Sequence, residues 1–559
     1  MDPQALLASL DEEQRHAATV FGVPLAVHAP AGSGKTRTVA ARLAYGIAIG
    51  ALEPQQCLAL TFTTRAAGEL RARLAALGSP LVATRTIHAA ALRQLRFFWA
   101  RSGGAALPQL QADRDALIAQ ARERLSLPTD TESVIQTATH IAWAKSHMYD
   151  PDTFAAMFEA AMRVPPRGGD ARELARVYAE YELIKATSGV MDFDDVLTLL
   201  IGLLDEQPEA ASQVRRTYRH LTVDEFQDTS PLQFALIRQW AGPRRDICVV
   251  GDPDQAIYGF AGADARYLRD FADYFPGADV VSLQRTYRCA PTIVAVARSL
   301  GLGEGTQPTG VGNDGDYREI ECVDDVHELT MVCERVAQLR AEGVDASRIA
   351  VLARQQDQVN DVVEALRADG QPVAMRGMVG FFQRPEVKLA LLDLRASGEQ
   401  SVLEAVTKLV TDAGWMPEQS ETDSLTHWDS YAVLLRLAQT LHEQDPSSKT
   451  EDFLAEVYQR AEALELPAAP AVSVMTMHAA KGLEWDAVIV VGMVEGVMPH
   501  AHARSESALA EERRLLYVAM TRARQSLTLT WPKTRKGQPA TRSRFLNYAA
   551  ASVSVNPGT

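Results

Sequence analysis

Short apolar runs alternate along this chain with longer stretches whose apolar residues recur at helical spacing. The short runs predict strands, and they lie at residues 24–28, 57–62, 220–226, 246–252, 349–354, 472–477, 486–493 and 527–531. Strands that alternate with helices are typical of parallel sheets covered by helices. The pattern therefore predicts an α/β fold.

Strand signals disappear in two places, between residues 90 and 189 and between residues 389 and 470. Both stretches have a sequence pattern typical of helices, and polar segments at 102–104 and 165–169 interrupt the first stretch. We expect two mainly helical insertions. The second, at some eighty residues, is short.

Length and composition are those of a globular protein with several cores. A chain of 559 residues suggests about three to five domains. No run of about 18 apolar residues appears, and the N-terminus lacks a signal pattern. We expect a cytoplasmic protein that does not bind membranes.

The five cysteines are scattered, without metal-binding spacing, so we expect free thiols rather than disulfides or a zinc site. The net charge of −15 argues against one broad basic surface for nucleic acid, but leaves room for a local basic groove.

A phosphate-binding loop is predicted at residues 29–36, between an apolar run and a helical stretch. Gly32 and Gly34 let the backbone approach phosphates, Lys35 supplies a cation, and the Thr36 hydroxyl can bind Mg²⁺. Ala29 stands where the common pattern has Gly, so the loop alone is a weakened match.

A second acidic strand end follows at residues 220–228. Asp224 is placed to hold Mg²⁺, and Glu225 to accept the proton of an attacking water. Alone, the pair could equally cap a helix. Together with the phosphate loop it indicates a P-loop nucleotide hydrolase.

A series of strings then resembles, in order, the motifs of the UvrD/Rep/PcrA-like superfamily 1A DNA helicases. They are Leu10–Gln14, Leu60–Ala67, Thr86–His88, Met191–Asp195, Asp224–Asp228, Val250–Phe260, Gln284–Arg288, Ile349–Arg354, Gly380–Lys388, Met475–Glu484, Glu511–Ala523 and Ser543–Leu546. The resemblance spans nearly the whole chain, and relatives often carry Ala at the position of Ala29.

The resemblance implies two tandem RecA-like cores with ATP between them. We expect residues 1–89 and 190–283 to form the first core, 90–189 its helical insertion, 284–388 and 471–547 the second core, 389–470 the short insertion of the second core, and 548–559 a tail. The tail leaves no room for a nuclease domain, so any nuclease should be a separate protein.

The resemblance also implies the roles at the ATP site. Lys35, Glu225, Gln255, Arg288 and Arg522 are the expected catalytic residues. Gln255 would sense the γ-phosphate, and the two arginines would stabilise its charge when the cleft closes. Arginines on helices are more often solvated or salt-bridged than catalytic. Only the motif strings around Arg288 and Arg522 favour a catalytic role for these two.

Further ATP contacts are implied at the phosphate loop and at the base. They are Gln14, Ala31, Gly32, Ser33, Gly34, Lys35, Thr36, Arg37, Tyr287 and Glu484, with Thr36 and Asp224 as Mg²⁺ ligands. Tyr287 would stack on adenine. The expected cofactors are ATP and Mg²⁺.

Single-stranded DNA would be held by base stacking on aromatic rings, worth roughly 1–3 kcal/mol per base, and by cations at its backbone. The positions implied are Phe62, Thr63, His88, Phe193, Tyr258, Phe260, Arg354, His478 and Lys481. An isolated aromatic is usually a core residue. The chain departs from its relatives at Phe260–Ala261, where they carry an aromatic followed by Arg.

The expected function is 3′ to 5′ movement on single-stranded DNA with unwinding at single–double strand junctions, by a monomer or weak dimer of bacterial or phage origin. The short second insertion also allows an ATPase or translocase subunit of a repair or anti-phage nuclease complex. A nucleotide-gated DNA-binding module and an RNA helicase are further alternatives.

Overall fold

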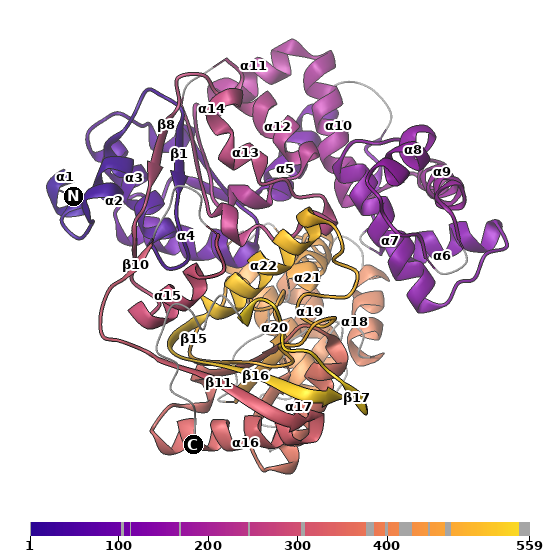
Figure 1. Ribbon diagram of the computed structural model, residues 1–559. Helices are drawn as coiled ribbons and strands as arrows, with labels where there is room; N and C mark the ends of the chain where they lie inside the picture. The colour runs from indigo at the N-terminus through magenta and orange to yellow at the C-terminus, as the bar shows by residue number, and fades with distance from the viewer. Residues whose placement is uncertain are drawn as a thin grey trace.

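The computed structural model of the chain contains two parallel sheets, one in each half (Figure 1). It describes residues 2–101, 106–111, 113–166, 169–243, 246–302, 308–375, 385–396, 401–412, 427–444, 448–463 and 471–546. The predicted α/β class with two parallel-sheet cores is confirmed. The predicted tail, 548–559, and the Gly380–Arg384 part of one motif string lie outside the described residues.

The first sheet has six strands, and every neighbouring pair is parallel. In spatial order they are β3 (Ala83–Thr86), β2 (Cys57–Thr61), β6 (His220–Val223), β7 (Ile247–Gly251), β1 (Leu25–His28) and β8 (Asp279–Ser282). The central strands are buried along their length, as expected for a parallel sheet covered on both faces.

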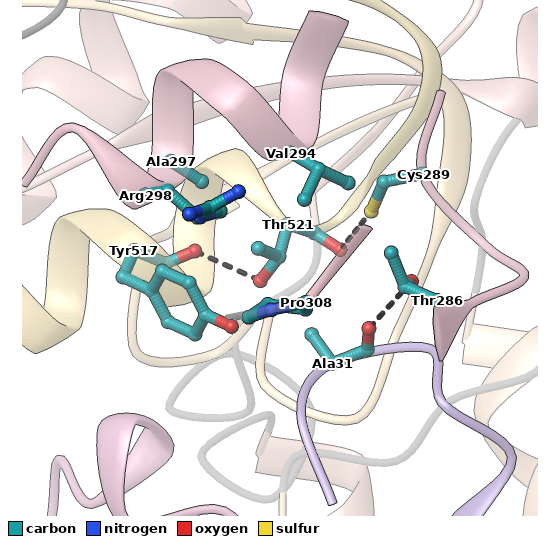
Figure 2. Close-up of a pocket in the computed structure, with 9 residues that line it drawn as sticks. All are labelled: Ala31, Thr286, Cys289, Val294, Ala297, Arg298, Pro308, Tyr517 and Thr521. Atoms are coloured by element: carbon teal, nitrogen blue, oxygen red, sulfur yellow. Dashed lines mark hydrogen bonds between the residues drawn. The ribbon is translucent and has the colours of Figure 1, made fainter. Parts of the chain in front are cut away.

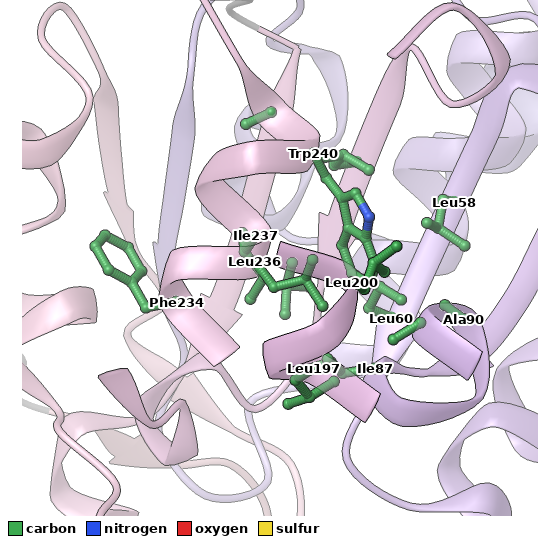
Figure 3. Close-up of a cluster of buried hydrophobic side chains, with 14 of the residues drawn as sticks. Leu58, Leu60, Ile87, Ala90, Leu197, Leu200, Phe234, Leu236, Ile237 and Trp240 are labelled. Carbon is green, nitrogen blue, oxygen red and sulfur yellow. The ribbon is translucent and has the colours of Figure 1, made fainter. Parts of the chain in front are cut away.

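Helices cover both faces of this sheet. They are α1 (Pro3–Leu7), α2 (Glu12–Thr19), α3 (Lys35–Ala48), α4 (Thr64–Ala76), α5 (Ile87–Trp99), α10 (Phe193–Glu206), α11 (Pro208–Thr217), α12 (Pro231–Ala241), α13 (Arg266–Arg269) and α14 (Phe271–Tyr274). One apolar cluster joins the sheet to α3 and α4. Another joins it to α5, α10 and α12, whose side chains meet around the buried Trp240 (Figure 3).

The first insertion contains α6 (Arg114–Arg124), α7 (Thr131–Ser146), α8 (Pro151–Ala160) and α9 (Ala171–Ser188). These helices share an apolar cluster of their own and form a lobe beside the first core (Figure 1). Two short strands, β4 (Gln109–Leu110) and β5 (Val190–Met191), pair at its base. The expected boundary at residue 90 falls inside α5, whose buried residues pack on the first sheet.

Buried ion pairs attach this lobe to the first core. Asp192, the N-cap of α10, lies 2.6 Å from Lys145 Nζ of α7 and 2.9 Å from Lys185 Nζ of α9. Asp195 and Glu182 complete the group. Two cations against three carboxylates leave a net charge of −1 in the cluster, and removing either lysine would leave buried carboxylates without a compensating cation.

The second sheet repeats the parallel arrangement. In spatial order its strands are β11 (Asp316–Asp324), β16 (Ala523–Arg535), β15 (Trp485–Val490), β12 (Ile349–Ala353), β14 (Val472–Thr476) and β13 (Val373–Met375), with β17 (Gln538–Pro539) antiparallel to β16. Its helices are α15 (Pro291–Arg298), α16 (Asp325–Ala341), α17 (Gln356–Ala368) and α22 (Glu506–Met520). A separate short pair, β9 (Arg285–Thr286) and β10 (Thr309–Gly310), lies beside the segment that joins the cores.

The second insertion contains α18 (Pro385–Ala396), α19 (Val402–Asp412), α20 (His427–Gln444) and α21 (Thr450–Ala463), which share a small apolar cluster. It reaches back to the first core, where Arg96 Nη1 of α5 lies 3.1 Å from Asp452 Oδ1 of α21. None of the described helices combines the length and apolar character that crossing a membrane needs.

The packing of α5 makes a stability prediction. Phe98 is buried in the first-core cluster, whereas its neighbour Phe97 is 41% exposed. We expect Phe98→Ala to lower the free energy of unfolding of the first core by about 3–5 kcal/mol, and Phe97→Ala by about 1 kcal/mol at most. Urea unfolding followed by tryptophan fluorescence measures both, and equal losses would contradict the assignment of α5 to this core.

Candidate ATP and DNA site

The phosphate loop joins β1 to α3, and its glycines adopt conformations that other residues rarely adopt. Gly34 is the N-cap of α3 in the left-handed region, at φ 83°. Gly32 has φ 75°, and a Cβ there would lie 2.4 Å from Cβ of Arg288 and 2.6 Å from Oγ1 of Thr286. The loop can therefore bind phosphate at the N-terminus of α3, and its backbone can approach the second core closely.

Lys35 and Glu225 form an ion pair at the centre of the site. Nζ of Lys35 lies 3.1 Å from both Glu225 carboxylate oxygens. Burial disfavours both charges, yet the Glu225 carboxylate, with Asp252 and Asp224, raises the pKa of Lys35. The ammonium groups of Lys35 and Lys481 likewise outweigh burial and hold the pKa of Glu225 at about 2.

Asp224 directly follows β6 and precedes Glu225, whose backbone lies in the left-handed region at φ 53°. Burial, and then the Glu225 carboxylate, raise the pKa of Asp224 to about 6. Asp224 is buried and Glu225 is partly exposed. Two adjacent carboxylates make a strong cation site, because the charge of one disfavours ionisation of the other. Lys35 supplies one cation here, and Mg²⁺ suits the same oxygen ligands.

A second row of polar side chains supports this pair. Gln227 Nε2 donates to Glu225 Oε2 over 2.5 Å, and Gln227 Oε1 accepts from the backbone N–H of Asp252. Asp252 in turn accepts from Gln255 Nε2 at 2.6 Å. The ends of β6 and β7 are thus joined by hydrogen bonds to the residue expected to sense the γ-phosphate.

The base end of the site is built from α2, the phosphate loop and the second core. Gln14 Nε2 donates to the carbonyl of Ser33, and Gln14 Oε1 accepts from Arg37, each at 2.7 Å. The Arg37 guanidinium stands 5.2 Å from the ring centre of Tyr287, which is 43% exposed. A flat, partly exposed ring beside an amide and a guanidinium suits a purine base.

The end of β9 and the residues that follow it dock directly on the phosphate loop. Thr286 Oγ1 donates to the carbonyl of Ala31 at 2.7 Å, and the Tyr287 N–H to that of Gly32 at 2.9 Å. Figure 2 shows a small pocket between the loop and the second core, where Cys289 Sγ donates to the carbonyl of Thr521 at 3.4 Å. The two cores therefore meet at the phosphate site.

Both candidate arginines of the second core lie at this junction. Arg522 is 1% exposed, and its Nη2 donates to Gln255 Oε1 of the first core at 3.1 Å. Arg288 Nε lies 2.5 Å from Glu484 Oε2. Burial, and then the Arg288 guanidinium, lower the pKa of Arg522 to about 10, so it is charged at neutral pH.

The residues present fit a nucleotide with a divalent cation. Ser33 Oγ is buried in the loop without a hydrogen-bond partner among the described residues, as a phosphate-binding hydroxyl would be before its ligand arrives. Thr36 lies on the first turn of α3, and Asp224 directly after β6. These two would hold Mg²⁺, which neutralises phosphate charge when bound.

One group of candidate DNA residues spans both cores. Phe260, in the short helix η4 (Gly259–Ala261), packs edge to face on Tyr258 at 6.2 Å and on His478 of the second core at 5.8 Å. Phe260 is 46% exposed. Burial, and then the Arg354 charge, lower the pKa of His478 to about 4, so this ring is neutral at neutral pH.

The other group lies at the carboxyl ends of β2 and β3. His88 and Phe193 pack edge to face at 6.0 Å, and burial lowers the pKa of His88 to about 4. Thr63 is the N-cap of α4, where its hydroxyl accepts from the N–H of Ala66, and Phe62 is partly buried against the first core. These side chains offer rings and a neutral imidazole rather than positive charge.

The expected backbone cations, Arg354 and Lys481, are both paired with carboxylates. Arg354 holds Glu512 through two nitrogens, at 2.7 and 3.1 Å. Lys481 Nζ lies 2.5 Å from Asp228 Oδ2 and 2.6 Å from the carbonyl of Gln255, so it ties the second core to the first. In this structure the Lys481 side chain lies in the cleft between the cores and not on an open surface.

Family models match nearly the whole chain. The UvrD/REP helicase N-terminal domain matches residues 10–276, and the UvrD-like helicase C-terminal domain matches 281–416 and 400–534. The chain belongs to the UvrD/REP helicase family. The predicted family is thereby confirmed.

Named relatives agree with this assignment. The chain is 38% identical to the ATP-dependent DNA helicase UvrD2 of Mycobacterium tuberculosis, over 99% of this chain and 83% of that protein. It is 29% identical to UvrD1 of Mycobacterium leprae, over 97% and 85%, and 25% identical to PcrA of Staphylococcus aureus, over 99% and 88%.

Some residues of the helicase site carried no assigned role in the sequence. Asp252, Gln227 and Asp228 lie inside quoted motif strings, but only the structure shows that they hold Gln255, Glu225 and Lys481. Their position at the carboxyl ends of two buried strands was the available signal.

The buried position of Arg522 predicts a catalytic defect. We expect Arg522→Ala to lower the kcat of ATP hydrolysis about 10³-fold or more, because a second-core arginine stabilises charge mainly in the transition state. Nucleotide affinity should change much less. Steady-state ATPase and nucleotide-binding assays measure both effects.

The matched control is Arg348→Ala, which removes an exposed second-core arginine paired with Asp486. It should keep wild-type turnover. An Arg522→Ala enzyme within threefold of wild-type kcat would show that this guanidinium does not reach the reacting phosphate.

Proposed function

We propose that this helicase hydrolyses ATP between its two cores and uses the cleft motion to move 3′ to 5′ along single-stranded DNA, unwinding duplex ahead of it. The observation that carries the proposal is the contact of Arg522 with Gln255 across the cleft, beside the Lys35–Glu225 pair. Relatives named as ATP-dependent DNA helicases support the substrate assignment.

The Lys35–Glu225 pair suggests how the site is activated. The Lys35 ammonium holds the pKa of Glu225 low against the effect of burial, which makes this carboxylate a weak base. When Lys35 turns toward the β- and γ-phosphates of ATP, that stabilisation weakens and the proton affinity of Glu225 rises. Glu225 then accepts the proton of the attacking water while the arginines stabilise the equatorial oxygens.

Movement would be coupled through the segment between Gln255 and Phe260. Gln255 contacts Arg522, and Phe260 lies five residues later against His478. A change at the γ-phosphate would therefore shift a stacking ring and its second-core partner together. Each stacked base contributes roughly 1–3 kcal/mol, enough to alternate grip between cores.

A second candidate function is the ATPase subunit of a repair or nuclease complex, with weak unwinding alone. The observation that favours it is Ala261, which leaves the Phe260 ring without a following arginine. Both candidates share the same motor.

The motor proposal predicts DNA-stimulated ATP hydrolysis. We expect single-stranded DNA to raise kcat at least about tenfold, and Lys35→Ala or Glu225→Gln to abolish turnover because phosphate charge and water activation are lost. Glu225→Gln should still bind ATP and DNA. A flat rate in the presence of DNA, or full activity of Glu225→Gln, would contradict the proposal.

Direction and unwinding need a separate measurement. We expect the purified chain to displace the labelled strand of a duplex with a 3′ single-stranded tail and not one with a 5′ tail. Displacement of streptavidin from a biotinylated single strand reports movement without unwinding. Displacement of streptavidin with an intact duplex would favour the subunit function, and preference for the 5′ tail would overturn the direction.

A further inference from the structure

The loop that carries Phe260 is held from two sides. This loop, residues 258–262, is called the Phe260 loop below. On the second-core side, a Cβ at Gly259 would lie 2.9 Å from Oε2 of Glu511 on α22. On the other side, a Cβ at Gly262 would lie 1.9 Å from Oγ of Ser146 at the end of α7. Ser146 of the first insertion therefore packs directly against the backbone of the Phe260 loop.

Arg163 extends this contact to Phe260 itself. It follows α8, and its Nη2 donates to the carbonyl of Phe260 at 3.3 Å. Its guanidinium stands 4.6 Å from the ring centre of Trp143, and Nε donates to Nδ1 of His140 at 3.4 Å. These contacts hold a cation beside a ring that is 46% exposed.

The charge of Arg163 is available, unlike that of the cations expected at the DNA backbone. Arg354 is paired with Glu512, and Lys481 with Asp228. Within the described part of the chain, Arg163 has no carboxylate at ion-pair distance. Burial lowers its pKa to about 10, against the opposing field of Glu511, so the guanidinium is protonated at neutral pH.

We propose that Arg163 is a DNA-binding residue that contacts the phosphate backbone of the single strand beside Phe260. It supplies from the first insertion the cation that Ala261 does not provide. A guanidinium fixed on an aromatic face keeps free N–H groups in a planar fork, which suits a phosphate. The inference rests on the proposed single-strand function.

The test is strand affinity as a function of salt. A labelled deoxythymidine oligonucleotide is titrated without nucleotide at several NaCl concentrations, and fluorescence anisotropy gives Kd. We expect Arg163→Ala to weaken binding about tenfold and to reduce the slope of log K against log salt by about 0.7, the share of one phosphate contact on a single strand. Arg163→Lys should keep most of the slope.

Two further variants make the result specific. Arg124→Ala removes an arginine of the same insertion that pairs with Glu180, and it should keep wild-type affinity and slope. Ala261→Arg, added to Arg163→Ala, should restore both, because it returns a cation next to Phe260. Recovery of affinity and slope in that double variant would support the assignment directly.

Other results would overturn it. An Arg163→Ala protein with unchanged slope, whether or not its affinity or melting temperature falls, would show that the arginine only braces the loop. If Ala261→Arg recovers none of the salt slope in the double variant, a cation at position 261 does not replace Arg163. No binding of single strands by the unaltered protein would overturn the proposed function as well, whereas normal wild-type binding with an unchanged variant slope overturns the role of Arg163 alone.

Discussion

The docking of residues 286–288 on the phosphate loop is the contact on which the rest of the site depends. Two backbone carbonyls of the loop, those of Ala31 and Gly32, accept hydrogen bonds from Thr286 and Tyr287. The contact is possible because Gly32 has no side chain at a point where a Cβ would collide with Arg288. It brings second-core residues to the loop of the first core.

Both cores contribute charged side chains to the cleft. Asp224, Glu225 and Asp228 come from the first core, and Lys481 and Arg522 from the second. In a buried site such charges interact more strongly than in water. A nucleotide that adds negative charge at Lys35 must therefore redistribute contacts on both sides of the cleft, which is the physical basis for the closing and opening that we propose.

The sequence predicted the fold well where each strand is a short buried run. The runs at 57–62 and 349–354 are β2 and β12, because apolar residues bounded by polar ones leave few alternatives to a buried parallel strand. The boundary near residue 90 was harder to place. Helical spacing alone does not tell which body α5 packs against, and the buried Phe98 assigns it to the first core.

The motif strings predicted which residues lie near the edge of each sheet. They did not predict which distant residues pair with one another. Lys481 and Asp228 are 253 residues apart in the sequence, and Arg354 and Glu512 are 158 residues apart. Residue types in a string cannot reveal that these cations are already neutralised. Arg163 lies outside every motif string, and only its contact with Phe260 relates it to the site.

We propose that the two cores act as one catalytic unit through Gln255 and Arg522. A double-mutant cycle on kcat measures this coupling, with Gln255→Ala, Arg522→Ala and both together. We expect strong coupling, so that the double variant is scarcely slower than the slower single variant. Losses in kcat that multiply would show that the two side chains act independently and would overturn the proposal.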